Sequence, residues 1–360
     1  MKQYRVAVVG ATGMVGQRFL TLLDGHPWFK VTAVAASPRS AGQPYGQAVA
    51  GRWMMDRLIP QDVIDMPVLD AGDVKAVSEQ ADFIFCAVVM PKDETRALEE
   101  AYAKAETPVV SSNSATRLLG DVPMLMPEIN PEHMQVINLQ RRRLGTKSGF
   151  IAVKPNCSIQ SYVGALHPLR PFGVREVSVC TYQAVSGAGR TLAGWPEMQD
   201  NVIPYIGGEE EKSEQEPLKI WGGFGEEGVK MAASPIISAQ CLRVPVSDGH
   251  LAAVSVRFDE KPSYEEILAA WRNFETLPQQ LGLPSAPKPF IKYFEEDDRP
   301  QPRLDRNEGK GMAVTVGRLR EDPIMDWRFV ALSHNTLRGA AGGGVLTAEL
   351  LCKEGWIQPK

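Results

Sequence analysis

The sequence predicts an α/β protein with two domains, the first built on a parallel sheet and the second of mixed α/β type. Its 360 residues exceed what one hydrophobic core usually serves. Buried apolar runs alternate with helical periodicity in the first part, whereas later strands alternate apolar with polar residues. With 44% hydrophobic and 23% charged residues, the composition is that of a folded chain rather than a disordered one.

The first part of the chain alternates expected strands with expected helices. Strands are expected over residues 5–9, 31–36, 82–88 and 108–110, and helices over 12–23 and 94–104. Gly25 is suited to end the first helix. Because each strand is followed by a helix, the strands should run parallel.

From about residue 150 the pattern changes to half-covered strands. Residues 176–183 and 251–258 alternate apolar with polar side chains. Two stretches, 203–224 and 282–305, are rich in Gly, Pro and charge, and we expect loops there. Residues 339–351 regain helical spacing, so the chain should close with a helix.

Charge and hydropathy exclude several classes of partner. A net charge of −4 and a pI near 5.9 give no basic field for a phosphate backbone, so nucleic acid is not expected as a partner. The longest apolar run, residues 83–90, is far shorter than the roughly 18 residues of a membrane span. Residues 4–9 lead straight into a glycine turn without a signal cleavage site, so we expect a cytoplasmic protein.

Cysteine usage favours a reducing compartment. The five cysteines are odd in number, widely spaced and form no CxxC pair: Cys86, Cys157, Cys180, Cys241 and Cys352. This spacing indicates neither a disulfide framework nor a zinc site, and no metal is expected. A single cysteine in such a protein can instead be a nucleophile.

A glycine-rich turn joins the first strand to the first helix. The segment Gly10-Ala11-Thr12-Gly13-Met14-Val15-Gly16 lets backbone N–H groups and the helix N-terminus approach a pyrophosphate. A GxxGxxG spacing alone is also compatible with a plain glycine turn, but its place between strand and helix favours a dinucleotide site. We therefore expect a Rossmann-like domain with cofactor contacts at Gly10, Thr12, Gly13, Met14 and Val15.

The end of the second strand predicts which dinucleotide is bound. NAD-preferring sites place an Asp or Glu about 20 residues after the glycines, against the ribose hydroxyl. This sequence instead offers Ser37, Arg39 and Ser40, a guanidinium and two hydroxyls suited to a 2′-phosphate. NADP is therefore the expected cofactor, the alternative being that Arg39 is only an exposed loop charge.

Cys157 stands in a setting typical of a nucleophile. It follows a short apolar strand, in Lys154-Pro155-Asn156-Cys157-Ser158-Ile159-Gln160, at the expected start of a helix. The positive end of the helix dipole there favours a thiolate. The other four cysteines lie in apolar patterns and are interpreted as small buried hydrophobic residues.

Four further motifs follow one another along the chain: Asn156-Cys157-Ser158, residues 183–189 (QAVSGAG), residues 243–250 (RVPVSDGH) and residues 335–343 (NTLRGAAGG). Together they resemble the aspartate-semialdehyde dehydrogenase family, especially its archaeal and fungal branch. The resemblance extends over almost the whole chain, and the order of the motifs is far more specific than any one of them. It implies reversible, NADP-linked interconversion of L-aspartate 4-semialdehyde plus phosphate with 4-aspartyl phosphate, towards lysine, threonine and methionine.

The resemblance implies a catalytic role for four residues. Cys157 would attack the C4 carbonyl of the substrate, and His250 would act as general acid and base. Gln183 would orient the substrate beside the thiol, and Asn156 belongs to the nucleophile motif. A histidine can equally have a structural role. The assignment of His250 as general acid and base therefore depends on its motif, which the remaining four histidines lack.

The same resemblance implies the contacts to the substrate and the phosphate. Arg243 would hold the α-carboxylate, and Glu209 with Lys212, three residues apart, would face the α-amino group and the phosphate. Three adjacent glutamates, 209–211, leave the choice among them open, and a charge run is often only a solvated face. Arg117, in the segment beginning at Asn113, matches a second phosphate-binding position, although a surface ion pair is an equal alternative. Asn113 itself would also contact the substrate.

The resemblance also implies the domain plan and the nicotinamide contacts. Ser186, Gly187 and Asn335 would contact the nicotinamide half of NADP. Residues 1–156 with a C-terminal helix in 335–360 would form the NADP-binding domain, and 157–334 the catalytic and dimerisation domain. A homodimer or homotetramer is expected, with a small-molecule substrate.

Two other functions compete with this one. A malonyl-CoA-type acyl-CoA reductase would keep the glycine turn, the cysteine and the histidine but would not need Arg243, Glu209 and Lys212. A catalytically silent NADP-binding regulator would keep the fold alone, and Cys157 with His250 argue against it.

Overall fold

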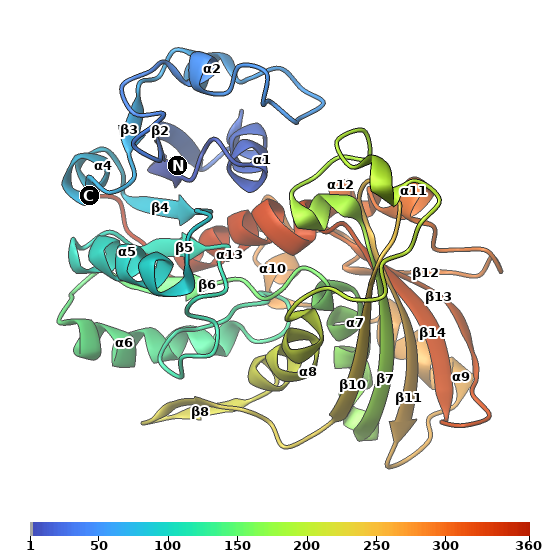
Figure 1. Ribbon diagram of the computed structural model, residues 1–360. Helices are drawn as coiled ribbons and strands as arrows, with labels where there is room; N and C mark the ends of the chain where they lie inside the picture. Colours follow the sequence, from blue (N-terminus) through green and yellow to red (C-terminus); the bar gives the residue numbers. More distant parts are fainter. Residues whose placement is uncertain (1–2) are drawn as a thin grey trace. The chain divides into compact units, whose positions relative to one another are not determined.

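The chain folds around two separate six-stranded sheets, as the computed structural model shows for residues 3–360 (Figure 1). The first unit contains the residues up to Lys154 together with 224–230 and 341–360. The second contains residues 155–223 and 231–340. The boundaries therefore differ from those expected: they fall after residue 154 instead of 156 and before residue 341 instead of 335, and residues 224–230 belong to the first unit instead of the second.

The first sheet is parallel throughout, in the strand order β3-β2-β1-β4-β5-β6. Its strands are β1 (Tyr4–Val9), β2 (Phe29–Ala36), β3 (Val68–Asp70), β4 (Phe83–Cys86), β5 (Val109–Ser111) and β6 (Ile151–Val153). Residues 6–9 and 83–86 are buried in unbroken runs, because helices cover both faces of the sheet. The expected parallel α/β domain is confirmed.

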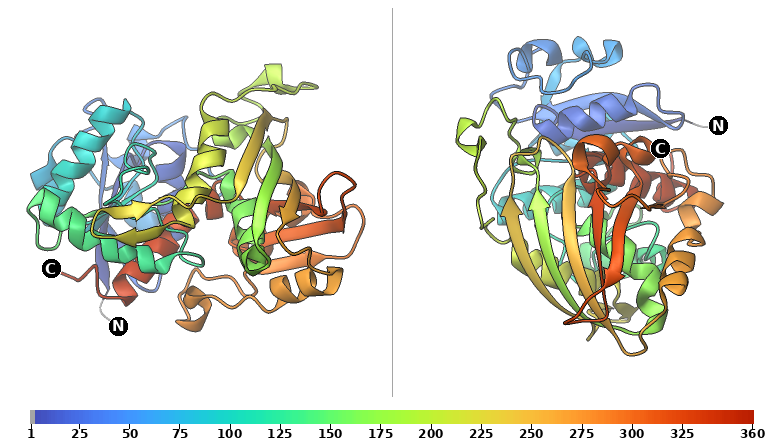
Figure 2. Two further views of the ribbon diagram at one scale, coloured as in Figure 1. Left: turned by 90° about the horizontal axis from the view of Figure 1, so that it is seen from below. Right: turned by 90° about the vertical axis from the view of Figure 1, so that its right-hand side faces the viewer.

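Two groups of helices cover the first sheet. The helices of this unit are α1 (Met14–Leu23), α2 (Tyr45–Ala48), α3 (Gln61–Ile64), α4 (Val74–Gln80), α5 (Lys92–Lys104), α6 (Ile137–Leu144) and α13 (Gly342–Lys353), with the 3₁₀ helix η1 (Pro131–Val136). Helix α1 packs beside α13, whereas α5 packs between α4 and α6, and Figure 2 shows the two groups on opposite faces. The expected return of the C-terminal helix to the first domain is therefore observed.

The second sheet is mixed, in the order β10-β7-β11-β14-β13-β12. Its strands are β7 (Val174–Gln183), β10 (Ile236–Arg243), β11 (His250–Phe258), β12 (Ile291–Phe294), β13 (Val314–Glu321) and β14 (Trp327–Ser333). The pairs β10–β7 and β12–β13 are parallel and the others are antiparallel. A separate hairpin is made of β8 (Gly223–Gly225) and β9 (Gly228–Lys230).

Helices cover one face of the second sheet and leave the other open. The helical segments are α7 (Ile159–Leu166), η2 (His167–Phe172), η3 (Val185–Ala188), η4 (Pro196–Met198), α8 (Glu209–Ile220), α9 (Tyr264–Arg272), α10 (Leu277–Gln280), α11 (Pro302–Asp305), α12 (Glu308–Gly311) and η5 (Leu337–Ala341). Helix α7 packs on β11, β13 and β14, α8 packs on β10, and α9 packs on β12. Along β11 every second residue is buried, and the right-hand view of Figure 2 shows no helix in front of that open face.

Two stretches expected to be loops contain regular structure. Residues 203–224 hold helix α8, and residues 282–305 hold β12 and α11. Helix α8 escaped the periodicity analysis because its buried face includes charged side chains, and Pro217 lies inside it. Strand β12 is only four residues long, which is too short for an alternation pattern to stand out.

Within the first unit, a buried histidine and a buried glutamate join the C-terminal helix α13 to the loop after α1. His26 Nε2 lies 2.9 Å from Glu349 Oε1, and the side chains are 6% and 0% exposed. His26 Nδ1 accepts the backbone N–H groups of Trp28 and Phe29. In the neutral ring the proton therefore lies on Nε2 and is donated to the carboxylate.

No helix among residues 3–360 is long and apolar enough to cross a membrane.

We predict that Glu349→Ala lowers the free energy of unfolding by about 2 kcal/mol, because the buried His26 N–H loses this acceptor. Glu349→Gln keeps a side-chain oxygen and should cost clearly less. Glu354→Ala, at an exposed residue just beyond α13, is the matched control. Urea unfolding followed by circular dichroism measures the difference, and equal midpoints for the Ala and Gln variants at position 349 would contradict the assignment.

Candidate active site

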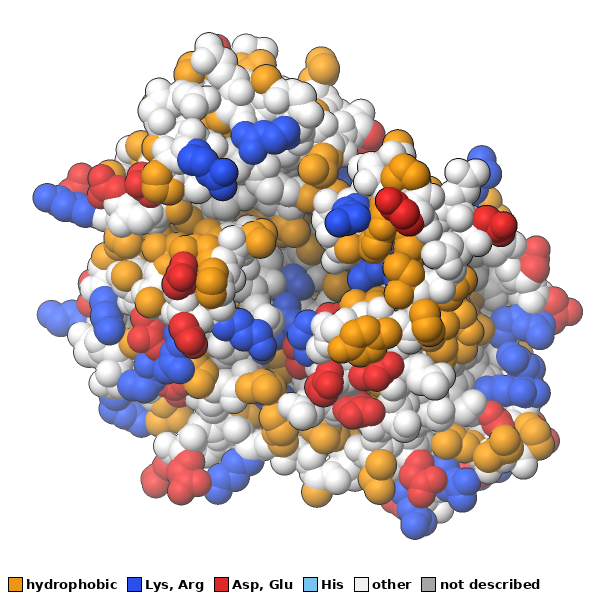
Figure 3. Space-filling view, in the orientation of Figure 1, with side chains coloured by type: hydrophobic (Ala, Val, Ile, Leu, Met, Phe, Trp, Pro, Cys, Tyr) orange, Lys and Arg blue, Asp and Glu red, His pale blue; other side chains and the backbone are white. Residues whose placement is uncertain are grey.

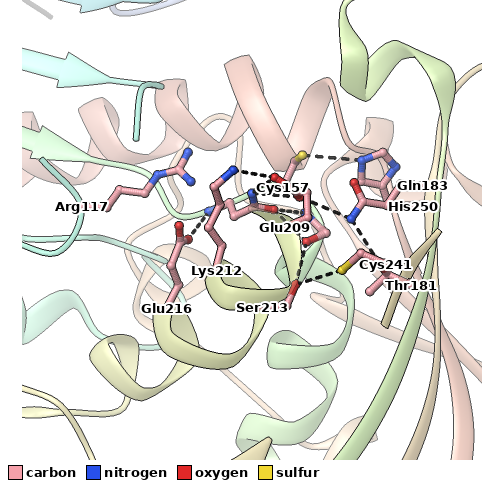
Figure 4. Close-up of polar contacts among 12 residues, drawn as sticks. Arg117, Cys157, Thr181, Gln183, Glu209, Lys212, Ser213, Glu216, Cys241 and His250 are labelled. Carbon is pink, nitrogen blue, oxygen red and sulfur yellow. Dashed lines mark hydrogen bonds and ion pairs between the residues drawn. The ribbon is translucent and has the colours of Figure 1, made fainter. Parts of the chain in front are cut away.

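A cysteine and a histidine from distant parts of the chain meet in the second unit. Cys157 lies between β6 and the start of α7, and its side chain is only partly buried. Its Sγ is 3.5 Å from Nε2 of His250, the fully buried first residue of β11. Figure 4 shows the two side chains pointing toward one another. This thiol–imidazole contact is the arrangement that nucleophilic catalysis requires.

The backbone of Ala184 orients the imidazole. Its N–H donates to His250 Nδ1 at 3.0 Å, so the neutral ring carries its proton on Nε2, which faces the sulfur. The carbonyl of the same residue accepts a hydrogen bond of 2.7 Å from Nη1 of Arg243. One buried peptide segment at the end of β7 therefore positions both His250 and Arg243.

Asn156 fixes the backbone of the nucleophile segment. Its Oδ1 accepts from the N–H and the hydroxyl of Ser158, at 2.7 and 2.8 Å, at the beginning of α7. Its own N–H donates to Glu216 Oε2 at 2.6 Å. Cys157 is thus held between two residues whose backbone groups are tied down. Glu216 was not predicted from the sequence, because nothing distinguishes it from the other charged residues of α8.

Glu209 and Lys212 lie on one face of α8, as their spacing predicts. Lys212 Nζ is 2.7 Å from Glu209 Oε1, and the Asn156 amide donates to both carboxylate oxygens. Gln183 Nε2 reaches Glu209 Oε2 at 3.3 Å. Glu209 is buried, whereas Glu211 is exposed and Glu210 accepts from a backbone N–H of β10. Of the three glutamates, only Glu209 joins the polar network of Figure 4.

Glu209 and Arg243 keep their charges although both side chains are buried. Burial by itself raises the pKa of Glu209, but the Lys212 ammonium and the amides of Asn156 and Gln183 bring it below the usual value. Burial lowers the pKa of Arg243, and the nearby Cys157 and Glu209 oppose that effect. The unit that holds the thiol–imidazole pair therefore also holds a buried carboxylate and a buried guanidinium.

Two glycines allow the backbone to approach the reacting groups. A Cβ on Gly187, in η3, would lie 2.8 Å from Arg243 Nη1 and 3.0 Å from His250 Nε2. A Cβ on Gly339 would lie 2.7 Å from the Cβ of Cys157. Any larger residue at either position would displace the cysteine, the histidine or the arginine. Gly187 was predicted to contact the cofactor. No role was predicted for Gly339, which lies in the motif of residues 335–343.

Asn335 joins two loops of the same unit. Its Oδ1 accepts the Gly249 N–H at 2.8 Å, immediately before His250, and its Nδ2 donates to Ser186 Oγ at 2.8 Å. Arg306, which the sequence did not single out, donates to Ser247 Oγ and to the carbonyl of Asp248. These bonds fix the loop that carries His250.

The glycine-rich turn of the first unit has the close packing of a dinucleotide site. Gly10 has φ +86°, and a Cβ on it would collide with the backbone of Ala87. Gly13 is the N-cap of α1, where a Cβ would meet nothing closer than 3.6 Å, so its surroundings are open. Thr12, Ser37, Arg39 and Ser40 line a neighbouring cavity. Met14 and Val15 form the first turn of α1.

Asn113 and Arg117 lie in the first unit, on the loop after β5. The Asn113 amide donates to Glu99 Oε1 at 2.9 Å and lies 3.5 Å from Cys86 Sγ. Burial raises the pKa of Glu99. Arg117 is 5% exposed and donates to the carbonyl of Ser112. Its burial argues against the alternative of a surface ion pair.

The remaining cysteines are in settings that favour the neutral thiol. Cys86, Cys241 and Cys352 are buried and Cys180 is half-buried. Burial raises the pKa of each of these four thiols above the usual value. Their interpretation as small hydrophobic residues therefore agrees with their surroundings.

Comparison with known proteins defines the class. Residues 5–137 match the family model of the semialdehyde dehydrogenase NAD binding domain, and residues 166–338 match that of the semialdehyde dehydrogenase dimerisation domain. The two units with their thiol–imidazole pair are therefore those of a semialdehyde dehydrogenase.

Individual relatives narrow the class. An aspartate-semialdehyde dehydrogenase of Archaeoglobus fulgidus is 46% identical over 98% of this chain and 99% of its own length, and that of Schizosaccharomyces pombe is 42% identical over 98% of each. The crystal structure of the Candida albicans enzyme with NADP has a TM-score of 0.89 at 38% identity, covering 99% of this chain and 100% of that one. The chain belongs to the aspartate-semialdehyde dehydrogenase family. The resemblance to archaeal and fungal members is confirmed.

We predict that Gly339→Ala slows the reaction of Cys157 with iodoacetamide by about tenfold, because the new methyl group moves the sulfur away from the Nε2–H donor of His250. Peptide mass spectrometry measures the rate at this cysteine alone. Gly223→Ala is the matched control, since a Cβ there meets nothing within 4 Å. An unchanged rate in the Gly339 variant would show that the close contact does not position the thiol.

Proposed function

We propose that this chain catalyses the reversible, NADP-dependent conversion of 4-aspartyl phosphate to L-aspartate 4-semialdehyde and phosphate. The observation that carries the proposal is the 3.5 Å contact between Cys157 Sγ and His250 Nε2. Buried Arg243 and Glu209 belong to the same unit and provide opposite charges for a zwitterionic substrate. Full-length relatives of the same family support this choice.

Cys157 provides covalent catalysis. Its thiolate adds to the C4 carbonyl carbon, and the proton on His250 Nε2 is available to the oxygen that becomes negative. The thiohemiacetal and the thioester of Cys157 differ by one hydride and one proton: hydride transfer is the chemistry that NADP supplies when bound, and His250 Nε2 takes back the proton of the hydroxyl group. Attack of a phosphate oxygen on the thioester carbon breaks the C–S bond, forms the acyl phosphate and returns the thiolate.

The charged residues of the second unit select the substrate. The guanidinium of Arg243 suits the α-carboxylate, because its planar fork can form two parallel hydrogen bonds. Glu209 suits the α-ammonium, and Lys212 is assigned to the phosphate. The family resemblance assigns Arg117 of the first unit to a second phosphate-binding position and Asn113 to a substrate contact. Gln183 and Asn156 hold the Glu209 carboxylate in place through their amides.

The residues of the first unit fit NADP. The packed glycine turn leaves N–H groups at the start of α1 for the pyrophosphate, from Gly10 to Val15. The cavity that includes Arg39 has a lining without carboxylates, which suits a 2′-phosphate. Ser186, Gly187 and Asn335 are assigned to the nicotinamide half.

The open face of the second sheet supports a homodimer. The family model over residues 166–338 is described as a dimerisation domain. Along β7, β10 and β11 the open face carries Tyr182, Ile236 and Leu251, side chains that gain from removal from water. A homodimer, or a homotetramer made of two such dimers, is the proposed assembly, and the cytoplasm is the proposed compartment.

We predict that Cys157→Ala reduces phosphate-dependent NADP reduction by aspartate semialdehyde to below about 0.1% of the parent rate, since no thioester can form. Cys180→Ala, at a half-buried cysteine outside the network, should keep full activity. Absorbance of NADPH measures both. If the parent oxidises NADPH with malonyl-CoA and is inactive with the semialdehyde, the acyl-CoA reductase alternative is correct; retained activity in Cys157→Ala would refute the covalent route.

We predict that substrate binding depends on an ionised Glu209 and is insensitive to mild acid. Since the Lys212 ammonium and the neighbouring amides outweigh burial and hold the pKa of Glu209 below that of an ordinary glutamate, about 4.3, its carboxylate stays charged as the pH falls from about 7 to about 5, and protonates only below that range. Calorimetry with the inactive Cys157→Ala protein should give constant affinity for aspartate semialdehyde over this interval. Adding Glu209→Gln should weaken binding about tenfold throughout. A fall in affinity near pH 5 that Glu209→Gln abolishes would contradict the lowered pKa.

A further inference from the structure

A polar cavity of about 290 Å³ lies beside the glycine-rich turn of the first unit. Its lining residues are polar or small, namely Thr12, Ser37, Arg39, Ser40, Gln43, Gln47, Ala48, Ala50 and Arg52. Two of them are arginines and none is acidic. Figure 3 shows basic side chains on the visible surface in the region where Figure 1 draws β2, α1 and α2.

Arg52 is the second arginine of this lining, and no sequence motif singled it out. It lies beyond α2, thirteen positions after Arg39, in a segment without regular structure. Its Nη2 group donates to the carbonyl of Ala48, so the guanidinium lies against the end of α2 at the cavity. The side chain is exposed, and most of its N–H donors remain available beyond the bond to Ala48.

Gln17 fixes the Arg52 segment to the glycine turn. This fully buried residue of α1 donates from Nε2 to the carbonyls of Thr12 and Arg52, at 3.0 and 2.9 Å. Its Oε1 accepts the N–H of Met54 at 2.8 Å. The Gln17 amide therefore binds the backbone of both segments that border the cavity, at Thr12 and at Arg52. It keeps Arg52 beside Thr12 although Arg52 lies in an irregular segment.

We propose that Arg52 is a second cation for the 2′-phosphate of NADP and that, with Arg39, it sets the preference for NADP over NAD. The proposal rests on the NADP dependence proposed above. A phosphate monoester carries close to two negative charges near neutral pH and has three acceptor oxygens, so two guanidinium groups and the hydroxyls of Ser37 and Ser40 complement it. The 2′-hydroxyl of NAD offers no negative charge and leaves the two cations uncompensated.

The competing explanation is that Arg52 only braces α2 through Ala48. A bracing role would affect every nucleotide that binds the adenosine side of the site, because the cavity wall itself would shift. A phosphate contact would affect only ligands that carry the 2′-phosphate. The two explanations therefore differ in the ratio of affinities, not in overall binding.

Calorimetric titration of the full-length protein with NADP and with NAD separates them. Arg52→Gln should weaken NADP binding about tenfold and leave NAD binding within about twofold. Arg57→Gln is the matched control, because Arg57 carries the same charge on the same segment, is exposed and lies outside the cavity lining. It should change neither affinity by more than about twofold. Circular dichroism confirms that each variant is folded.

A fragment pair tests the phosphate directly. Adenosine 2′,5′-bisphosphate should lose affinity for Arg52→Gln as NADP does, whereas 5′-AMP should not. Equal losses for both nucleotides, or equal effects of the Arg52 and Arg57 variants, would overturn the proposal. Because these are binding measurements, they stand apart from the catalytic assay. A parent that binds NADP selectively but fails to turn over the semialdehyde would refute the proposed reaction and leave the role of Arg52 intact.

Discussion

The thiol–imidazole contact is the constraint on which the second unit depends. For Cys157 Sγ and His250 Nε2 to lie 3.5 Å apart, two loops must press against them with backbone rather than side chains. Gly187 and Gly339 make that approach possible. Asn335 then holds two loops in place through its hydrogen bonds to Gly249, just before His250, and to Ser186, just before Gly187. The reacting pair is therefore positioned by residues that perform no chemistry themselves.

Features that depend on local chain properties could be predicted from the sequence. The turn at Gly10, the alternation of strands and helices, and the distinct setting of Cys157 follow from φ preferences, periodicity and position beside a helix start. The spacing of Glu209 and Lys212 correctly indicated a shared helical face, although the surrounding stretch read as a loop. The assignments of substrate and cofactor to these residues remain predictions that the experiments above address.

Contacts between segments far apart in the chain could not be predicted from the sequence. Glu216 meets the Asn156 N–H across 60 positions, and Gln17 meets Arg52 across 35. A buried glutamate or glutamine has no periodic signature, because its place is set by one backbone donor or acceptor elsewhere in the fold. Arg52 was missed for the same reason: its segment becomes part of a cavity wall only after Gln17 joins it to the glycine turn.

Helix α8 shows how the site shapes the fold that carries it. Its buried face contains Glu209, Glu216 and Lys219, where a structural helix would place leucine or valine. Each buried charge needs partners, and both glutamates accept hydrogen bonds from the nucleophile segment: Glu209 from the Asn156 amide and Glu216 from the Asn156 N–H. Loss of either carboxylate would thus leave a buried donor of the nucleophile segment without this acceptor. The polar character that hid α8 from periodicity analysis is the same property that lets it position Cys157.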